Sequence, residues 1–418
     1  MRGGGHEQGH KSRPRLVHGS ASHPTSSSKH RLWLRTLGGA AVICLAITAA
    51  ATATATAAAA AAPGGRAQAS STNQQEAVAT YNALQQNLYV ASQSLYGGGP
   101  SNSCGTYSCL WPFTNAAAGT VYLYGTPKGA SYLSNVAASQ TGLGRYVDPS
   151  EVSPTGAAQP PAYQSAVAPP LGPGGATYYD DNGWVGLNLI HAYLLTSNRT
   201  YLTLAQYELN FIISGWDTNA SDGCPGGVFW EDVAGSERNT TANGAGAALA
   251  LELDRLTGNT SDLTWATSVY QWVVHCLGTG SGLYNDHVNP NGSVNTTIWS
   301  YNQGVMVGAG VLLFQVTGNS AYLEQAEQTA AAAVSYFGTG TALVNQGPAF
   351  NAIYFRNLFL LDQVAPNAAY ASEAQSFATT MWAQRQARTG LIDPQYGVNG
   401  TAPMVEIYAL LAGSSPTP

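Results

Sequence analysis

Charged side chains are scarce in this sequence. Only 9% of its 418 residues are Asp, Glu, Lys or Arg, and the formal net charge is -6. Nucleic acids and anionic membranes are bound by clusters of Lys and Arg, and 16 such residues are too few to provide that surface. We therefore expect no nucleic-acid partner. The aromatic and amide side chains, which are more abundant, suit a neutral ligand rich in hydroxyl groups, such as a sugar.

Several motifs of other enzyme classes are also missing. The cysteines do not form the paired C-x2-C clusters typical of zinc sites, and His275 and His287 have no spacing that indicates a metal site. No glycine-rich phosphate loop follows a strand, and no Gly-x-Ser-x-Gly segment indicates acyl transfer. We therefore expect neither a metal nor a cofactor.

The cysteines indicate an oxidising compartment. Cys44 lies near the front of the chain, and the other four are Cys104, Cys109, Cys224 and Cys276. An even number of cysteines is typical of exported proteins with disulfides. We expect Cys104 to bridge locally to Cys109, and Cys224 to pair with Cys276 and tie two hairpins together.

The front of the chain has the pattern of a targeting segment. Residues 1–36 are polar and basic, an apolar run extends over Leu37–Ala62, and Ala67–Ala69 offers a small-x-small cleavage site. The apolar run is also long enough to cross a bilayer, so an uncleaved N-terminal anchor is the alternative. The pattern predicts a leader at residues 1–69 and a secreted or extracellular domain at residues 70–418, which contacts a membrane only if the leader is retained.

Adjacent carboxylates, Asp180 and Asp181, precede an amphipathic segment. From Trp184 the apolar residues recur every three or four positions, which predicts a helix with the carboxylates at its start. Acids in the first turn of a helix often do no more than cap it and complement its dipole. The same geometry also lets both carboxyls reach one cavity, since neighbouring side chains point about 100° apart. Retaining glycosidases need two carboxyls about 5–5.5 Å apart. The dipeptide alone leaves both interpretations open.

A repeated turn indicates helical hairpins. Ser197, Gly258 and Gly318 lie about sixty residues apart, each between the end of one helical segment and an Asn that precedes the next. Gly and Asn at such a point are typical of a left-handed helix end, and a short turn makes the two helices antiparallel. The period fits a helical hairpin with a long loop, repeated around a closed ring. Strand patterns are scarce, and residues 227–230 are the best candidate.

Four short motifs occur in order along the chain. They are Tyr179-Asp180-Asp181 followed by Trp184; Gly215-Trp216-Asp217 followed by Gly226-Gly227-Val228-Phe229-Trp230; Tyr301-Asn302-Gln303-Gly304; and Phe350 to Leu360, which includes Arg356. Taken together they resemble glycoside hydrolase family 76, the endo-α-1,6-mannanases, over roughly Glu76 to Ala412. The resemblance implies an all-α fold, the (α/α)6 barrel, in a single catalytic domain over residues 70–418.

The resemblance also implies roles for residues. It makes Asp180 the nucleophile and Asp181 the acid/base of a retaining double displacement that cleaves internal α-1,6-mannosidic bonds. The residues that it places in substrate binding are Tyr179, Trp184, Trp216, Asp217, Trp230, Tyr301, Asn302, Gln303 and Arg356. The aromatic residues suit sugar stacking, but they equally suit a core. A charge on Asp180 raises the pKa of Asp181 while the helix dipole lowers both, so the sequence does not separate the two roles.

We expect a monomer that acts on α-mannan polysaccharide or mannooligosaccharides. Three other functions stay open at this stage. A transglycosylase of the same fold would pass the glycosyl unit to another sugar, and a non-catalytic cell-wall protein would bind sugar without turnover. An enzyme acting on unsaturated uronides is the third, and the scarcity of basic residues counts against it.

Overall fold

The helices alternate along the chain between buried and more exposed ones. The structure, a computed structural model, describes residues 63–148, 162–233, 235–338 and 341–415, all within the unit Ala60–Pro418. In these residues the buried helices are α2 (Leu110–Tyr124), α4 (Tyr179–Thr196), α6 (Thr240–Thr257), α8 (Ser300–Thr317), α11 (Pro348–Asp362) and α13 (Val398–Leu411). The more exposed ones are α1 (Pro63–Leu88), α3 (Leu133–Leu143), α5 (Arg199–Ser214), α7 (Thr260–Leu277), α9 (Ser320–Phe337) and α12 (Ala368–Ala383).

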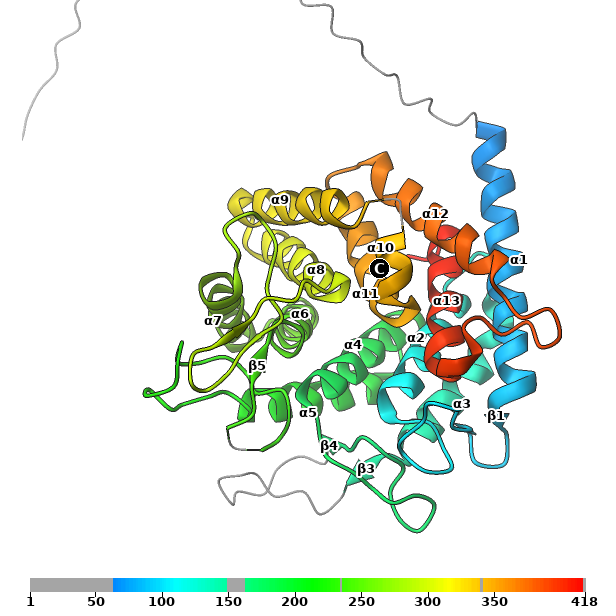
Figure 1. Cartoon of the computed structure of the whole chain (residues 1–418), viewed down its shortest axis with the longest axis horizontal. Helices are drawn as coiled ribbons and strands as arrows, with labels where there is room; N and C mark the ends of the chain where they lie inside the picture. Colours follow the sequence, from blue (N-terminus) through cyan, green and yellow to red (C-terminus); the bar gives the residue numbers. More distant parts are fainter. Residues whose placement is uncertain (1–62, 149–161, 234, 339–340, 416–418) are drawn as a thin grey trace, which may run out of the picture. The chain divides into compact units, whose positions relative to one another are not determined.

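The buried helices close into a ring. Each contacts the next in the order α2, α4, α6, α8, α11 and α13, and α13 in turn contacts α2. Each more exposed helix packs against a ring helix, and Figure 1 shows the blue α1 beside the red α13. The pair of α1 and α13 therefore joins the first and last helices of the described chain. This arrangement confirms the predicted all-α (α/α)6 barrel.

Strands are short and lie in the loops between helices. Antiparallel pairs are formed by β1 (Tyr89–Val90) with β2 (Leu95–Tyr96) and by β3 (Val147–Asp148) with β4 (Ala162–Tyr163). A three-stranded antiparallel sheet has the order β5 (Arg238–Asn239), β6 (His287–Val288) and β7 (Val294–Asn295). The remaining short elements are the helix α10 (Thr341–Gln346) and two 3-10 turns, Ala130–Tyr132 and Pro394–Tyr396. The expected strand at residues 227–230 is wrong, because only an isolated bridge joins Val228 to Trp216.

The repeated turn has the predicted left-handed geometry. Ser197, Gly258 and Gly318 end α4, α6 and α8 with φ values of 59°, 74° and 69°. The Asn that follows each of them caps the next helix by accepting a hydrogen bond from a backbone N–H two residues on. Glycine adopts positive φ without steric cost, whereas serine does not. The turn at Ser197 is thus the strained member of the three.

Four ring helices hold a loop through a buried polar side chain at their fourth position. Asn243 of α6 accepts from the Val228 N–H (2.7 Å) and donates to the Val228 carbonyl (3.0 Å). The same pair of bonds joins Asn182 to Tyr163, Gln303 to Tyr284, and the Thr401 hydroxyl to Ile392. All four side chains are fully buried. We call these contacts the loop clamps.

The clamps also follow the sixty-residue repeat. Asn182, Asn243 and Gln303 each lie fifteen positions before the left-handed residue that ends the same helix. Asn351, at the fourth position of α11, makes a related pair of bonds with the Leu343 carbonyl and the Ser300 hydroxyl. Loops with little regular structure must still pair their buried backbone groups. The clamps do this from the rigid ring helices.

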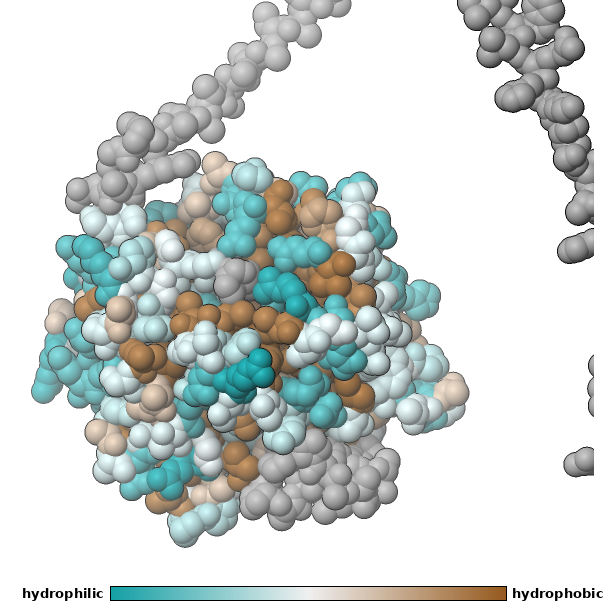
Figure 2. All heavy atoms as spheres, turned by 180° about the vertical axis from the view of Figure 1, so that it is seen from behind, coloured by the Kyte–Doolittle hydropathy of each residue, from teal (hydrophilic) through white to brown (hydrophobic). Residues whose placement is uncertain are grey.

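The surface mixes polar and apolar side chains. The face opposite to the view of Figure 1 carries apolar patches between polar residues (Figure 2). Large apolar side chains that are exposed in the described residues are Leu133, Tyr207, Val233, Val294, Tyr336 and Tyr396. Exposure of single apolar side chains is ordinary at protein surfaces.

The predicted leader lies mostly outside the described residues. This holds for residues 1–36 and for the apolar run Leu37–Ala62. The predicted cleavage site at Ala67–Ala69 falls within α1. Among the helices that the structure describes, none has the length and hydropathy needed to cross a membrane.

Exchanging the residues at two equivalent turns tests the strain at Ser197. We expect Ser197→Gly to raise the free energy of unfolding by about 0.5–1 kcal/mol, since it relieves a left-handed serine. Gly258→Ser should lower it by a similar amount, because a Cβ there meets no neighbour and only the backbone conformation opposes it. Urea denaturation of both variants measures the two changes. A destabilised Ser197→Gly variant would contradict the assignment of strain.

Removing a clamp should release a loop and destabilise the fold. Asn243→Ala leaves the buried N–H and carbonyl of Val228 without partners, which we expect to cost about 2–4 kcal/mol. Asn319→Ala is the control, because it removes a single exposed cap bond worth about 1 kcal/mol. Denaturation gives the energies, and limited proteolysis of residues 215–230 reports release of the loop. Equal losses in the two variants would show that the clamp adds nothing beyond an ordinary cap.

Candidate active site

A cleft of about 510 Å³ opens where the ring helices begin. It is lined by first-turn residues of five ring helices: Trp111 of α2, Asp180 and Asp181 of α4, Thr241 of α6, Tyr301 of α8 and Phe350 of α11. The N-terminal ends of these helices therefore meet at one end of the ring. Helix N-termini carry partial positive charge, which favours the ionised form of the carboxylates placed at this end of the barrel.

The aspartate pair occupies the first turn of α4, as the sequence predicted. The loop that ends at Trp230 pairs with the start of this helix, because the Tyr179 N–H donates to the Trp230 carbonyl (2.9 Å). That pairing brings the Trp230 indole N–H to Asp180, which accepts a hydrogen bond from it. Asp180 Oδ1 also accepts from the backbone N–H of Asp181 (3.0 Å). Asp180 is thus the more strongly hydrogen-bonded carboxylate of the two.

Burial dominates the protonation of the pair. It raises the pKa of Asp180 to about 7, although the hydrogen bonds from Asp181 and Trp230 act in the opposite direction. The pKa of Asp181 is raised well above its ordinary value by burial and then by the neighbouring charge of Asp180. Both side chains keep some exposure to the cleft. When the pair holds one proton, the environment favours its residence on Asp181.

Two aromatic clusters line the cleft. In one, the ring of Tyr178 lies 4.9 Å from that of Trp230. In the other, the Phe350 ring lies 4.1 Å from Tyr301 and 5.5 Å from Trp111. A hexose presents an apolar C–H face, which packs on aromatic rings. The cleft therefore offers stacking surfaces on two sides.

The charged residues of the cleft lining are acidic or histidine. They are Asp180, Asp181, Glu237, Asp286 and His287, and the lining contains no Lys or Arg among the described residues. His287 Nδ1 lies 3.0 Å from Asp286 Oδ2. Within the part of the chain that the structure describes, no group of three or more His, Cys, Asp or Glu side chains is placed to hold a metal. The cleft suits a neutral polar ligand rather than an anionic one.

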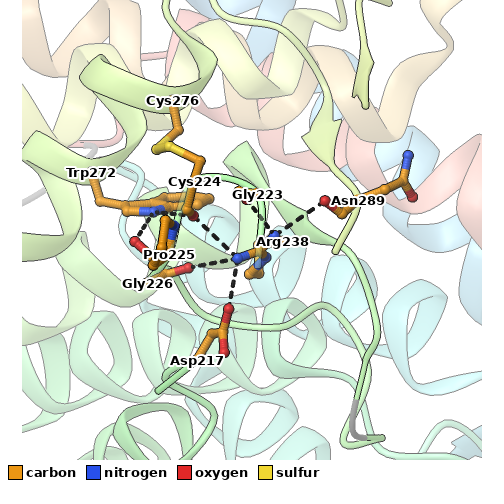
Figure 3. Close-up of a disulfide and its surroundings, with 9 residues drawn as sticks. All are labelled: Asp217, Gly223, Cys224, Pro225, Gly226, Arg238, Trp272, Cys276 and Asn289. Carbon is orange, nitrogen blue, oxygen red and sulfur yellow. Dashed lines mark hydrogen bonds and ion pairs between the residues drawn. A yellow bond between two sulfur atoms is a disulfide. The ribbon is translucent and has the colours of Figure 1, made fainter. Parts of the chain in front are cut away.

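A buried arginine holds the loop that delivers Trp230 (Figure 3). Arg238 Nη1 forms an ion pair with Asp217 Oδ2 (2.6 Å), and the same guanidinium donates to carbonyls of residues 223, 224, 226 and 289. The Trp272 indole N–H also donates to the carbonyls of Cys224 and Pro225. The disulfide between Cys224 and Cys276 fixes the loop to α7.

Both predicted disulfides are present. Cys104–Cys109 spans a Cα–Cα distance of 5.2 Å, and Cys224–Cys276 spans 6.1 Å. The first lies beside the cleft, since both of its cysteines line the cleft together with Ser103. The two disulfides thus fasten loops next to the candidate site.

The structure brings five of the predicted site residues together. The cleft lining contains Asp180, Asp181, Trp184, Trp230 and Tyr301. The other six lie outside it, and their contacts give them structural roles. These six are Tyr179, Trp216, Asp217, Asn302, Gln303 and Arg356.

Three of these six fix the start of α4 and the loop before Trp230. Tyr179 stacks on Phe211 (4.7 Å) and its hydroxyl donates to Asp232. The Trp216 ring packs on Gly226, where an added Cβ would lie 2.9 Å from the indole. Asp217 is buried against Arg238, as described above. These contacts support the cleft wall, and the sugar binding that the family resemblance implies for the three residues stays a prediction.

Each residue of the motif Tyr301-Asn302-Gln303-Gly304 makes a different kind of contact. Tyr301 lines the cleft, whereas the Asn302 amide donates to Asp286, which lines it (3.1 Å). Gln303 is the loop clamp of α8. A Cβ at Gly304 would lie 2.7 Å from the Cα of Tyr354 on α11, so glycine permits the two ring helices to approach. Asn302 and Gln303 are therefore positioning residues.

Arg356 lies inside the ring rather than in the cleft. It borders an interior cavity of about 60 Å³, pairs with Glu406 (3.5 Å) and contacts the far side of Trp184, with 5.8 Å between the guanidinium and the ring centre. Trp184 borders both the cavity and the cleft. Arg356 thus supports the floor of the cleft through Trp184.

Several lining residues were not predicted. The chief ones are Trp111, Tyr178, Glu237, Asp286 and Phe350. Trp111 and Phe350 stand near the start of a ring helix, the position that Tyr301 has in α8. The hairpin repeat could therefore have predicted that Trp111 and Phe350 line the cleft. Glu237 and Asp286 come from loops, where the helical repeat does not predict which residues face the cleft.

Comparison with known proteins identifies related sequences. A model of glycosyl hydrolase family 76 matches residues 161–404. Mannan endo-1,6-alpha-mannosidase DCW1 of Candida glabrata is 35% identical over 135 residues, which are 30% of this chain and 30% of that protein. The protein of the same name from Saccharomyces cerevisiae is 29% identical over 186 residues, or 40% of this chain and 41% of the relative. The matched regions thus span less than half the length of these relatives.

Solved structures share the fold. A glycoside hydrolase family 76 mannosidase of Bacteroides thetaiotaomicron superposes with a TM-score of 0.68 at 21% identity, covering 82% of this chain and 98% of that one. The GH76A α-1,6-mannanase of Salegentibacter gives 0.64 at 21% identity, covering 81% and 99%. An inactive variant of the latter, with two consecutive aspartates replaced by asparagine, was crystallised with α-1,6-mannotriose.

The raised pKa values predict that the aspartate pair weakens folding at neutral pH. A carboxyl whose pKa is higher in the folded than in the unfolded chain opposes folding increasingly as pH rises between the two pKa values. We expect Asp180→Asn and Asp181→Asn each to raise the free energy of unfolding at about pH 8 by on the order of 1 kcal/mol. The gain should vanish below about pH 4, where the wild-type carboxyls are protonated in both states.

Thermal denaturation across this pH range measures the effect. Asp222→Asn, a loop variant outside the cleft lining, is the control. Variants of the pair that are less stable than the wild type at high pH would contradict the raised pKa values.

Proposed function

The chain belongs to glycosyl hydrolase family 76, and we propose that it cleaves internal α-1,6-mannosidic bonds of mannan with retention of configuration. The observation that carries the proposal is the partly buried aspartate pair at the start of α4, in a cleft that aromatic residues also line. Two relatives named as mannan endo-1,6-alpha-mannosidases support the bond type. The inactive Salegentibacter variant supports the role of two consecutive aspartates.

In the proposed mechanism Asp180 is the nucleophile. It accepts hydrogen bonds from Trp230 and from the Asp181 N–H, and it lies at a helix N-terminus, all of which favour its ionised form. Its oxygen attacks the anomeric carbon and forms a covalent glycosyl ester while the glycosidic bond breaks.

Asp181 is the proposed acid and base. The charge on Asp180 and burial hold the proton on Asp181 until the leaving oxygen of the glycosidic bond takes it. Esterification of Asp180 then removes that charge, which lowers the pKa of Asp181. The Asp181 carboxylate can now take a proton from the water that attacks the ester, which releases the sugar and restores both carboxyls.

The cleft supports a neutral substrate. Its aromatic clusters provide stacking surfaces, and its further polar groups are acids, a histidine, an asparagine, two serines and a threonine. An anionic uronide would need a cationic partner, and the described lining supplies no Lys or Arg. The lining therefore favours mannan over an acidic polysaccharide.

We also infer export, with residues 1–69 as the leader and residues 70–418 as the catalytic domain. The two disulfides support an oxidising compartment. The basic start and apolar run of the leader support passage through a membrane.

Product analysis on unbranched α-1,6-mannan tests the function. We expect the wild type to release short mannooligosaccharides whose first-formed reducing ends are α-anomers by NMR. Asp180→Asn and Asp181→Asn should each lower kcat/KM by about 10³-fold or more, because each removes a group that acts in the transition state. Asp222→Asn serves as the matched control and should retain the wild-type rate.

The other outcomes select the alternatives. Products that form only when an acceptor sugar is added would indicate a transglycosylase. Mannan binding without turnover by the folded wild type would indicate a non-catalytic sugar-binding protein. A wild-type rate in either cleft variant would return that aspartate to the role of a helix cap.

A further inference from the structure

A second hollow lies beside the cleft. This distal pocket, of about 380 Å³, is formed by α10, the start of α11, the 3-10 turn Pro394–Tyr396 and the start of α13. Trp111 and Phe350 line both the cleft and the distal pocket, and their ring centres are 5.5 Å apart. The two hollows are therefore neighbours across one pair of rings.

Neutral amides dominate the polar lining of the distal pocket. They are Asn345, Gln346, Gln395 and Asn399. Gln346 Oε1 accepts from the Ser300 N–H (3.1 Å), and Asn399 Oδ1 accepts from the Asn115 amide (2.8 Å). These bonds fix the two amides through their oxygens, and the NH2 groups remain as donors. Carboxamides with available donors suit the hydroxyl oxygens of a sugar.

The same pocket has an aromatic residue at its edge. Tyr396 lines the distal pocket and is 52% exposed. An exposed tyrosine alone is ordinary, but this one lines the amide-rich hollow together with Trp111 and Phe350. Ligand sites on proteins commonly combine aromatic surface with a few polar groups in this way.

The loop that carries Tyr396 is held in place. Thr401 clamps Ile392 through both backbone groups, and the Ser101 hydroxyl donates to the Gln395 carbonyl (2.9 Å). Asp393 adopts the left-handed conformation with φ of 46°. Non-glycine residues in this conformation persist where their surroundings fix them, and they cluster at functional sites. A fixed loop offers a preformed surface.

We propose that the distal pocket binds neutral hexosyl units of the glycan chain whose scissile bond lies at Asp180 and Asp181. The chain would cross the rings of Trp111 and Phe350, stack on Tyr396 and donate or accept hydrogen bonds at the four amides. This assignment rests on the proposed function for the identity of the glycan. The proposal adds that the protein binds a glycan more tightly when the chain is long enough to reach the distal pocket as well as the cleft.

Calorimetry with α-1,6-mannooligosaccharides of increasing length tests the pocket. Asp181→Asn full-length protein is used as the background, so that bound chains stay intact. We expect affinity to rise with length, and Tyr396→Ala to weaken binding of the longest chains by about 10-fold relative to the shortest. Asn345→Trp, which fills the pocket from an exposed position, should have the same selective effect. Tyr336→Ala is the control, because that tyrosine is similarly exposed (56%) but lies on α9.

The outcomes separate this proposal from the proposed function. The same length dependence in the Tyr396→Ala, Asn345→Trp and Tyr336→Ala variants would overturn the distal pocket, even if the wild type degrades mannan. Suppose that only Tyr396→Ala and Asn345→Trp lose affinity for the longest chains, and that the wild type does not turn over mannan. This result would support the distal pocket as a glycan site and contradict the proposed hydrolase activity. Absence of binding at every length would overturn both.

Discussion

The loop clamps are the constraint on which the candidate site depends. The long loops that join the helical hairpins contain little regular structure, yet they must bring Trp230, Glu237 and Asp286 to one cleft. Buried amides and a hydroxyl on the ring helices pair with single loop residues through both backbone groups. Each ring helix is packed between two neighbouring ring helices, so the clamped loop residues are held by a rigid support. A catalytic site needs such support to hold side chains in a productive geometry.

The ring also creates an electrostatic conflict that the site uses. Helix N-termini that meet at the cleft favour negative charge, whereas burial disfavours it. For the aspartate pair burial is stronger, and the pKa values of Asp180 and Asp181 are both raised. The hydrogen bonds differ between the two, since Trp230 and a backbone N–H donate to Asp180. Neighbouring residues on one helix thereby receive different tendencies to ionise.

Much of the fold could be predicted from the sequence, because hairpin ends have local signals. The left-handed ends at Ser197, Gly258 and Gly318 and the Asn caps depend only on nearby residues. The aspartate pair was placed at a helix start for the same reason. Contacts across the ring have no such local signal. The family resemblance assigned Asp217 and Arg356 to substrate, and the sequence did not show that they form ion pairs with Arg238 and Glu406 inside the protein.

The placement of Tyr301-Asn302-Gln303-Gly304 shows that a family motif holds residues with structural contacts as well as residues that line the cleft. Successive residues of a helix point in directions about 100° apart, so four in a row cannot all face one cleft. Here one residue lines the cleft, one orients an acid that lines it, one clamps a loop and one admits a neighbouring helix. Replacing any of the last three would disturb the site through its support. A motif of this kind therefore contains residues that the ring needs for packing as well as residues that line the cleft. Burial distinguishes them, since Asn302 and Gln303 are fully buried whereas Tyr301 lines the cleft.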